Sequence, residues 1–447
     1  MEQQNNLLEG NIVKTLLIFA GPFLVANLLQ ALYGAADLLI VGKFSSSAEV
    51  SAVATGSQFM QTITGVIVGI NTGATVLIGQ YFGKKKYKHI ADTMGTVICI
   101  FAIMAVILTV VMVVFTGNIT TLMRTPVQAT EYTKEFILIS SCGIPFIIGY
   151  NAVSGILRGL GNSKAPLFFI AIACLINIAL DLILVAGFHM GSTGAAISTV
   201  TAQSVSFLLG IIFFKKKGFC FEFNRTHIKL QAAKAKIILK LGLPIALQDG
   251  LVNIAFLVVT AIINTMGLTA SASVGVVEKL IVFSMIPPFA FASAIAVMTA
   301  QNIGAGKPKR AKQSLYTGIG FSLIFGIIFC IYSQWNPKSL ISLFSTDRAV
   351  IVTASLYLKS YSIDCILVCF VFCINSFLVG YGNSMFPMIQ STIATFLIRI
   401  PVPYVLSKMP GVTLYQIGFA SPLASALSIV MCMIYMRHGR YNKRHIY

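Results

Sequence analysis

Apolar residues fill long, continuous blocks of this chain, and short polar loops separate the blocks. Each block is about 20 residues long or longer, which is the length that an α-helix needs to cross the hydrocarbon core of a membrane. The pattern therefore predicts an all-α, polytopic membrane protein with twelve transmembrane helices. The predicted spans are residues 12–41, 50–80, 93–115, 134–157, 166–187, 193–214, 237–264, 272–300, 313–333, 354–379, 387–405 and 413–436.

Composition and charge agree with this assignment. Hydrophobic residues make up 57% of the chain and charged residues 10%, whereas soluble domains contain about 25% charged residues. In a soluble protein, a net charge of +19 would indicate a nucleic-acid partner. Here the basic residues lie at the edges of the apolar blocks, so we expect no nucleic-acid partner. Alternate loops hold 23 basic residues on one side and seven on the other. The positive-inside rule then places both termini in the cytoplasm. We expect the protein in the cell membrane.

The second half of the chain repeats elements of the first half at a fixed spacing. The sequence Gly-Asn-Ser-x-x-Pro at residues 161–166 recurs 221 residues later, at residues 382–387. The same offset relates the Gln-x-x-Gly sequences at residues 80–83 and 301–304, and a Lys-rich loop follows each of them. Several matches at one offset indicate an internal duplication.

The duplication predicts two pseudo-symmetric six-helix lobes with the same orientation in the membrane. We expect an N-lobe at residues 1–215, a basic cytoplasmic linker at 216–236, and a C-lobe at 237–447. Parallel repeats of this kind indicate alternating access around a central cavity. The linker has two open interpretations, a solvated tether or a segment that binds anionic lipid headgroups.

The first span contains one carboxylate, Asp37. Gln30, Tyr33 and Asp37 are spaced i, i+3, i+7, so on a helix all three project from one face. An acid at this depth costs about 2.5–3.5 kcal/mol on the mildest insertion scale. The alternative, an acid at a helix end that reaches the headgroups, is weaker because residues 38–41 continue the apolar run. We therefore expect a functional role for Asp37.

The fifth span carries a second polar site. Asn177 and Asp181 are one helical turn apart, and the sixth span adds a hydroxyl at Thr199. Sodium, a hard cation, needs several oxygen ligands, and two nearby acids can hold a proton near neutral pH. The sequence thus predicts a site for Na⁺ or H⁺, although it does not show that these helices meet. Pro22 removes a backbone hydrogen bond within the first span, and we expect a hinge or a tolerated kink there.

The second half contains intramembrane charges at other positions. Its charged candidates are Asp249, Glu278, Asp364 and Arg399. None of these acids falls where the 221-residue offset would place a copy of Asp37 or Asp181; valines occupy both of those positions, Val258 and Val402. The charges either pair between helices or line a substrate cavity, and the sequence favours neither.

The sequence gives no indication of enzymatic activity. It contains no phosphate-binding Gly-x4-Gly-Lys-Ser/Thr, no Gly-x-Ser-x-Gly and no His-Glu-x-x-His. The nine cysteines have no neighbouring residues at the spacing of a metal site. We therefore expect neither catalysis nor a cofactor, apart from the coupling ion Na⁺ or H⁺.

Three features are shared with a known family: twelve spans in two lobes, the Gln-x-x-Gly sequences, and the Gly-Asn-Ser…Pro element of each half. With them the chain resembles the multidrug and toxic compound extrusion (MATE) family, bacterial type. The resemblance implies a cation site at Asp37, Asn177, Asp181 and Thr199, with Gln30 and Tyr33 around it and a bend at Pro22. The C-lobe departs from the family. A glutamate that some branches carry in the seventh span falls near Asn253 here, and an aspartate of the tenth span falls near Val368. A C-lobe cavity would then involve Asp249, Asn253, Glu278, Asp364 and Arg399.

The resemblance implies a secondary active transporter. It would exchange Na⁺ or H⁺ for organic, often cationic and amphipathic compounds, such as drugs or toxic metabolites, and it would act as a monomer. Two alternatives remain open. A flippase for lipid-linked precursors would need a cavity rich in arginine, whereas Arg399 is the arginine found inside a span. A membrane scaffold would not need paired acids in two helices of one lobe.

Overall fold

The computed structural model describes residues 7–123, 125–218 and 221–439. Four residues that contribute to the topology prediction lie outside this range: Arg124, Arg440, Lys443 and Arg444. Among the described residues there is helix but no strand. Eleven helices are long and apolar enough to cross a membrane, and a bent pair of helices supplies a twelfth span. The prediction of an all-α, twelve-span membrane protein is confirmed.

The described residues form two compact units. Unit 1 contains residues 25–243, and unit 2 contains residues 7–24 and 244–439. The predicted lobes have their boundary within the linker. The units differ from those lobes because the first part of the first span belongs to unit 2, and the linker with the start of the seventh span belongs to unit 1.

Two long helices, α1 (Ile12–Phe44) and α9 (Ala232–Asn264), contribute residues to both units. The other helices of unit 1 are α2 (Ser47–Gly83), α3 (Tyr87–Val114), α4 (Thr116–Leu122), η1 (Val127–Ala129), α5 (Thr130–Cys142), α6 (Ile144–Gly159), α7 (Lys164–Asp181), η2 (Leu182–Gly187), α8 (Gly191–Lys217) and η3 (Arg225–His227). Those of unit 2 are α10 (Leu268–Gly304), α11 (Pro308–Trp335), α12 (Pro337–Ile341), α13 (Arg348–Gly380), α14 (Met385–Ala394), η4 (Thr395–Arg399), α15 (Pro401–Ser407), α16 (Leu414–Ile417) and α17 (Ala420–Arg437).

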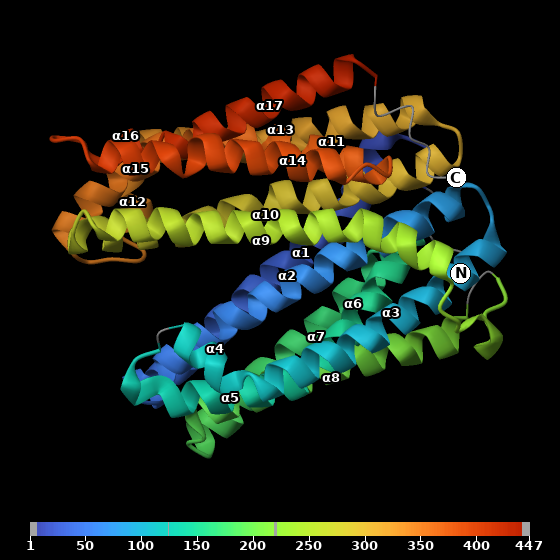
Figure 1. Ribbon diagram of the computed structural model, residues 1–447, viewed down its shortest axis with the longest axis horizontal. Helices are drawn as coiled ribbons and strands as arrows, with labels where there is room; N and C mark the ends of the chain where they lie inside the picture. The colour runs from blue at the N-terminus through green and yellow to red at the C-terminus, as the bar shows by residue number, and fades with distance from the viewer. Residues whose placement is uncertain (1–6, 124, 219–220, 440–447) are drawn as a thin grey trace. The chain divides into compact units, whose positions relative to one another are not determined.

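Within each unit the long helices run alongside one another (Figure 1). In unit 1, α6 packs against α2, α3 and α8, and α7 packs against α8. In unit 2, α10, α11 and α13 pack against each other, and α17 packs against α13. Large apolar side chains such as Leu39, Val114 and Leu397 are more than half exposed on the protein surface. Outward-facing apolar side chains of this kind suit helices that contact lipid.

The repeated Gly-Asn-Ser element forms the same turn in both units. Gly161 has φ +88° and Gly382 has φ +94°, a backbone region that favours glycine. In each turn the asparagine side-chain oxygen then accepts a hydrogen bond from the backbone N–H three residues later, at 3.0 Å in unit 1 and 3.4 Å in unit 2. The duplication inferred from sequence is therefore present in the geometry of the loops.

The predicted fourth span, residues 134–157, is not one straight helix. The segments Val127–Cys142 and Ile144–Gly159 meet at an angle of 46°. The break is at Gly143, and Pro145, in the first turn of α6, has no backbone N–H with which to continue the preceding helix. This proline explains why a single apolar block gives two helices.

The first third of α1 and its middle lie in different hydrophobic cores. Leu16, Phe19 and Phe23 pack in a core of unit 2 that includes residues of α10 and α13. Ala26 packs in a core of unit 1 with residues of α6 and α7. The change from one core to the other occurs within one turn of Pro22, so α1 connects the units at the residue where the sequence predicts a bend.

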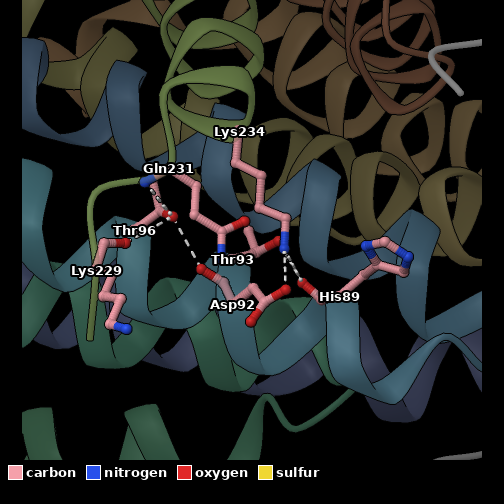
Figure 2. A network of polar contacts seen from close by, with 7 residues as sticks. All are labelled: His89, Asp92, Thr93, Thr96, Lys229, Gln231 and Lys234. Carbon is pink, nitrogen blue, oxygen red and sulfur yellow. Dashed lines mark hydrogen bonds and ion pairs between the residues drawn. The ribbon is translucent and has the colours of Figure 1, made fainter. Parts of the chain in front are cut away.

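The start of α9 is fastened to α3 by a polar network (Figure 2). The Lys234 ammonium group donates to Asp92 Oδ2 at 2.9 Å and to the backbone oxygen of His89 at 3.2 Å. The Thr96 hydroxyl donates to the backbone oxygen of Lys229 at 3.3 Å. Both partners of the Lys234–Asp92 ion pair are largely buried, so the pair is weakly screened by salt. The linker is therefore held against unit 1.

Unit 2 contains a corresponding attachment at the start of α11. The Arg310 guanidinium group donates to three parts of the segment before α1, namely the backbone oxygens of Leu7, Glu9 and Gly10. Arg310 lies 221 residues after His89. In each repeat, the start of the third span therefore binds a segment of the other repeat. The start of α3 binds the segment that leads into α9, and the start of α11 binds the segment that leads into α1.

Small residues allow α2 and α9 to approach closely within unit 1. A Cβ atom on Gly242 would lie 2.5 Å from Ile70 Cα, and one on Gly73 would lie 2.7 Å from Gly242 N. These are backbone atoms, which cannot rotate away. Close helix packing in membranes depends on such small residues.

Replacement of Gly242 by alanine should therefore destabilise the protein by about 1–3 kcal/mol, because the added methyl group overpacks the contact. A Cβ atom on Gly250, in the same helix, would have no other atom within 4 Å. Gly250→Ala should leave stability unchanged or raise it slightly. Thermal unfolding of the two purified variants in one detergent tests the difference; equal midpoints would contradict the assignment.

Candidate functional site

Three helices of unit 1 bring Asp37, Asn177 and Thr199 together. The Thr199 hydroxyl on α8 donates to Asp37 Oδ2 on α1 at 3.3 Å. The Asn177 amide on α7 donates to the same hydroxyl at 3.4 Å. Thr199 thus links an amide and a carboxylate that are 140 residues apart in the chain. The sequence predicts these residues as one site but contains no evidence of their contact.

Asp181 completes a group of four residues, of which Asp37, Asn177 and Asp181 are buried and Thr199 is half-buried. It lies one turn after Asn177 on α7 and is close enough to Asp37 for the two carboxyl groups to interact electrostatically. The exposed fraction is 7% for Asp37, 1% for Asn177 and 0% for Asp181. Two acids are therefore adjacent in a region from which water is nearly excluded, where like charges repel strongly.

Most of the acceptor atoms of this group have no donor. Asp37 Oδ1, Asn177 Oδ1 and both carboxylate oxygens of Asp181 are buried without a hydrogen-bond partner. A buried acceptor without a donor costs about 1–3 kcal/mol, and more if it is charged. Four such oxygens on neighbouring side chains match the donor set of a small hard cation. A proton bound to one of the carboxylates would also lower the cost.

The backbone changes its geometry immediately after Asp181. Residues Leu182–Gly187 form a π-helix, a conformation that is rare and is found frequently at functional sites. The site also includes residues that the sequence did not single out. Ser198 interacts with Asp181, and Gln203 interacts with Tyr33. Gln203 lies one turn after Thr199 on the same helix face, and this spacing could have identified Gln203 from the sequence.

The remaining residues proposed for the first span lie in different environments. Tyr33 is partly buried and within electrostatic reach of Asp37. Gln30 lies two turns before Asp37 and is exposed. Pro22 lies in the part of α1 that belongs to unit 2. Of these three, Tyr33 is the one that the structure places beside the carboxylates.

In unit 2 the charged residues proposed for a cavity fall into two groups. Glu278 accepts a hydrogen bond from the Thr260 hydroxyl at 3.3 Å. The Arg399 guanidinium carbon lies 5.5 Å from the centre of the Phe256 ring. Asp364 is 1% exposed and within electrostatic reach of Arg399. Asp249 and Asn253 form the second group; both are exposed on α9.

Among residues 7–123, 125–218 and 221–439, no group of three or more His, Cys, Asp or Glu side chains could hold a metal ion. The candidate site of unit 1 contains two such residues, and its other oxygens come from an amide and a hydroxyl. These ligands suit a monovalent hard cation better than a transition metal.

Replacement of Thr199 by valine should destabilise the protein, because it preserves the shape of the side chain but removes the donor to Asp37 Oδ2. The expected loss is about 1–3 kcal/mol. Thr199→Ser retains the hydroxyl and should stay near the wild-type value. Thermal unfolding in detergent at pH 7 compares the two, and equal stability of all three proteins would show that the hydrogen bond contributes nothing.

Comparisons with known proteins agree with this architecture. A family model described as MatE matches residues 22–183 and again residues 244–405, in accord with the duplication. The chain is 26% identical over 428 residues to the probable multidrug resistance protein YoeA of Bacillus subtilis, covering 94% of this chain and 92% of that protein. It is 25% identical over 405 residues to the multidrug export protein MepA of Staphylococcus haemolyticus, covering 91% and 89%. A transporter of the MOP superfamily from Pyrococcus furiosus has the same fold, with a TM-score of 0.92, 18% identity and 99% coverage of both chains. Because the family model covers most of the sequence in two copies, the chain belongs to the MatE family of membrane transporters.

Proposed function

We propose that this protein is a secondary active multidrug efflux transporter that exchanges Na⁺ or H⁺ for organic compounds. The observation that carries the proposal is the group of buried oxygens without donors at Asp37, Asn177 and Asp181 in unit 1. A protein that keeps such a group within its spans must neutralise it or use its charge. The names of the multidrug resistance and export relatives support drugs as the exported compounds.

The cation has a defined task in this proposal. When it enters the site, it neutralises one of the two carboxylates and removes their repulsion. When it leaves, the unpaired charge makes that conformation less stable. A membrane potential of 100 mV adds about 2.3 kcal/mol for each elementary charge moved fully across. Either Na⁺ or H⁺ satisfies these requirements.

Exchange requires that the cation and the drug favour different conformations, because a ligand with equal affinity for both conformations shifts nothing. Helix α1 can supply the difference. Asp37 lies in the part of α1 that belongs to unit 1, and Pro22 lies in the part that belongs to unit 2. Pro22 cannot donate a backbone hydrogen bond to the preceding turn. We propose that α1 bends there when the charge on Asp37 changes.

The topology completes the proposal. The excess of basic residues on one side supports a cell-membrane protein with both termini in the cytoplasm. Drugs then leave the cell while the cation enters along its gradient. We propose that one chain is sufficient, because the four residues of the cation site come from a single unit.

Asp37→Asn should abolish drug efflux from intact cells, because the amide cannot carry the charge that binds the cation. The measurement is accumulation of a fluorescent organic cation in cells that express the variant. Asp347→Asn is the matched control, because Asp347 is exposed and caps α13, and asparagine is an equally good cap. Immunoblotting of membranes checks that both variants are present. Wild-type efflux by the Asp37 variant would contradict its role.

A further inference from the structure

The linker between α8 and α9 is packed against α3. The backbone N–H of Gln231 donates to the Thr96 hydroxyl at 3.4 Å, and that hydroxyl donates to the backbone oxygen of Lys229 at 3.3 Å (Figure 2). A Cβ atom on Gly95 would overlap the backbone oxygen of His227, so the linker backbone lies directly on the surface of α3. The second half of the linker therefore has a fixed position.

Aromatic rings hold the first half of the linker. Phe221 stacks on Tyr87, the first residue of α3, with ring centres 6.1 Å apart. Phe223 stacks on His227 at 6.0 Å. A solvated tether, one of the two interpretations that the sequence leaves open, would need none of these contacts. The linker is instead part of the folded surface of unit 1, beside the turn between α2 and α3.

Exposed basic side chains gather where the linker meets this turn. His89 is within electrostatic reach of Lys86 and Lys88 of the turn and of Lys234 at the start of α9, which places the cations of the two segments near one another. The exposed members are Lys85, Lys86, Lys88, Arg225, Lys229 and Lys236, and we call them the basic surface. Among the described residues, none of these six side chains forms an ion pair.

Nearby carboxylates do not balance the basic surface. Asp92 is already paired with Lys234 at 2.9 Å. Glu222 is the one acid in the sequence from residue 215 to residue 240, which contains eight lysine and arginine residues. The surface therefore carries a strong net positive charge, and its charged groups have no protein partner that would explain their number.

Apolar side chains are exposed beside these charges. Ile228 is 41% exposed and Leu230 is 53% exposed, one on each side of Lys229 in the chain. The linker joins two candidate membrane spans, Gly191–Lys216 and Ala232–Asn264, so the basic surface lies at the edge of the membrane. Clusters of Lys and Arg directly beside a transmembrane helix are typical of sites that bind anionic lipids, and exposed apolar side chains can enter the headgroup region.

We propose that the basic surface of unit 1 binds anionic phospholipids of the cytoplasmic leaflet. The lipid phosphates lie against the basic side chains, and Ile228 and Leu230 contact the apolar part of the lipid. A membrane presents many phosphates in one layer, which matches six separate exposed cations better than a single free phosphate does. The inference goes beyond ion–drug exchange, because it depends neither on the coupling ion nor on the exported compound.

Native mass spectrometry of the purified full-length protein in detergent tests the proposal, because it resolves bound lipids one by one. The protein is titrated with phosphatidylglycerol, which is anionic, or with phosphatidylcholine of the same acyl chains, which has no net charge. Phosphatidylglycerol should bind about tenfold more tightly or better, since one basic residue near an anionic surface contributes about a fivefold change in affinity. Equal affinity for the two lipids would overturn the proposal without any variant.

The triple variant Lys88→Gln, Arg225→Gln, Lys229→Gln removes three exposed charges of the basic surface. It should weaken phosphatidylglycerol binding by about tenfold or more and leave phosphatidylcholine binding within about twofold. Unchanged binding of phosphatidylglycerol would overturn the proposal. Equal loss for both lipids would indicate damage to the fold rather than loss of a charged surface, and it would also overturn it.

The matched control removes the same charge from exposed positions that the sequence places on the opposite side of the membrane. This variant is Lys338→Gln, Arg348→Gln, Lys408→Gln. It should bind phosphatidylglycerol as the wild-type protein does. If it loses as much affinity as the first triple variant, net charge alone explains the effect and the assignment to the basic surface is wrong.

Two further arms identify the ligand. The charge-preserving variant Lys88→Arg, Arg225→Lys, Lys229→Arg should retain the preference for phosphatidylglycerol, because a lipid surface is recognised through its charge; loss of that preference would contradict the proposal. Replacement of ammonium acetate by ammonium phosphate at equal ionic strength should leave the lipid bound. Displacement of the lipid by phosphate would show a site for a free anion and would overturn lipid binding.

Discussion

The energetic cost of an ionisable group without a partner inside a membrane is the constraint on which this structure depends. Asp37 and Asp181 are adjacent and nearly inaccessible to water, and their free carboxylate oxygens have no donors. Such a group is stable only when a cation or proton is bound or when water reaches it. We propose that the site therefore differs in free energy between conformations, which is what coupling to an ion gradient requires.

Two helices, α1 and α9, have residues in both units. Each is anchored at its start, α9 by Lys234 to unit 1 and the segment before α1 by Arg310 to unit 2. The change of unit lies next to Pro22 in α1 and Pro244 in α9. We propose that a change of charge at Asp37 acts on α1, whose first residues belong to unit 2.

Much of this architecture could be predicted from the sequence, because membrane spans follow from local hydrophobicity and the repeat from matching motifs. The shared face of Asn177 and Asp181 also follows from spacing alone. The hydrogen bond between Thr199 and Asp37 could not be predicted, since it joins helices 162 residues apart. The bend at Gly143 and the contact of Arg399 with Phe256 likewise depend on how helices pack. The second half lacks copies of Asp37 and Asp181, so the repeat was no guide to its chemistry.

Everted membrane vesicles test the central claim most directly, because the two candidate cations can be loaded separately. The cytoplasmic face then points outward, and exported dye accumulates in the vesicle lumen. With Na⁺ or H⁺ concentrated in the lumen, one of the two gradients should drive accumulation of tetramethylrhodamine methyl ester, and vesicles that contain Asp37→Asn should show none. Equal accumulation by wild-type and variant vesicles, or accumulation that is indifferent to both gradients, would contradict a cation site at Asp37 and Asp181.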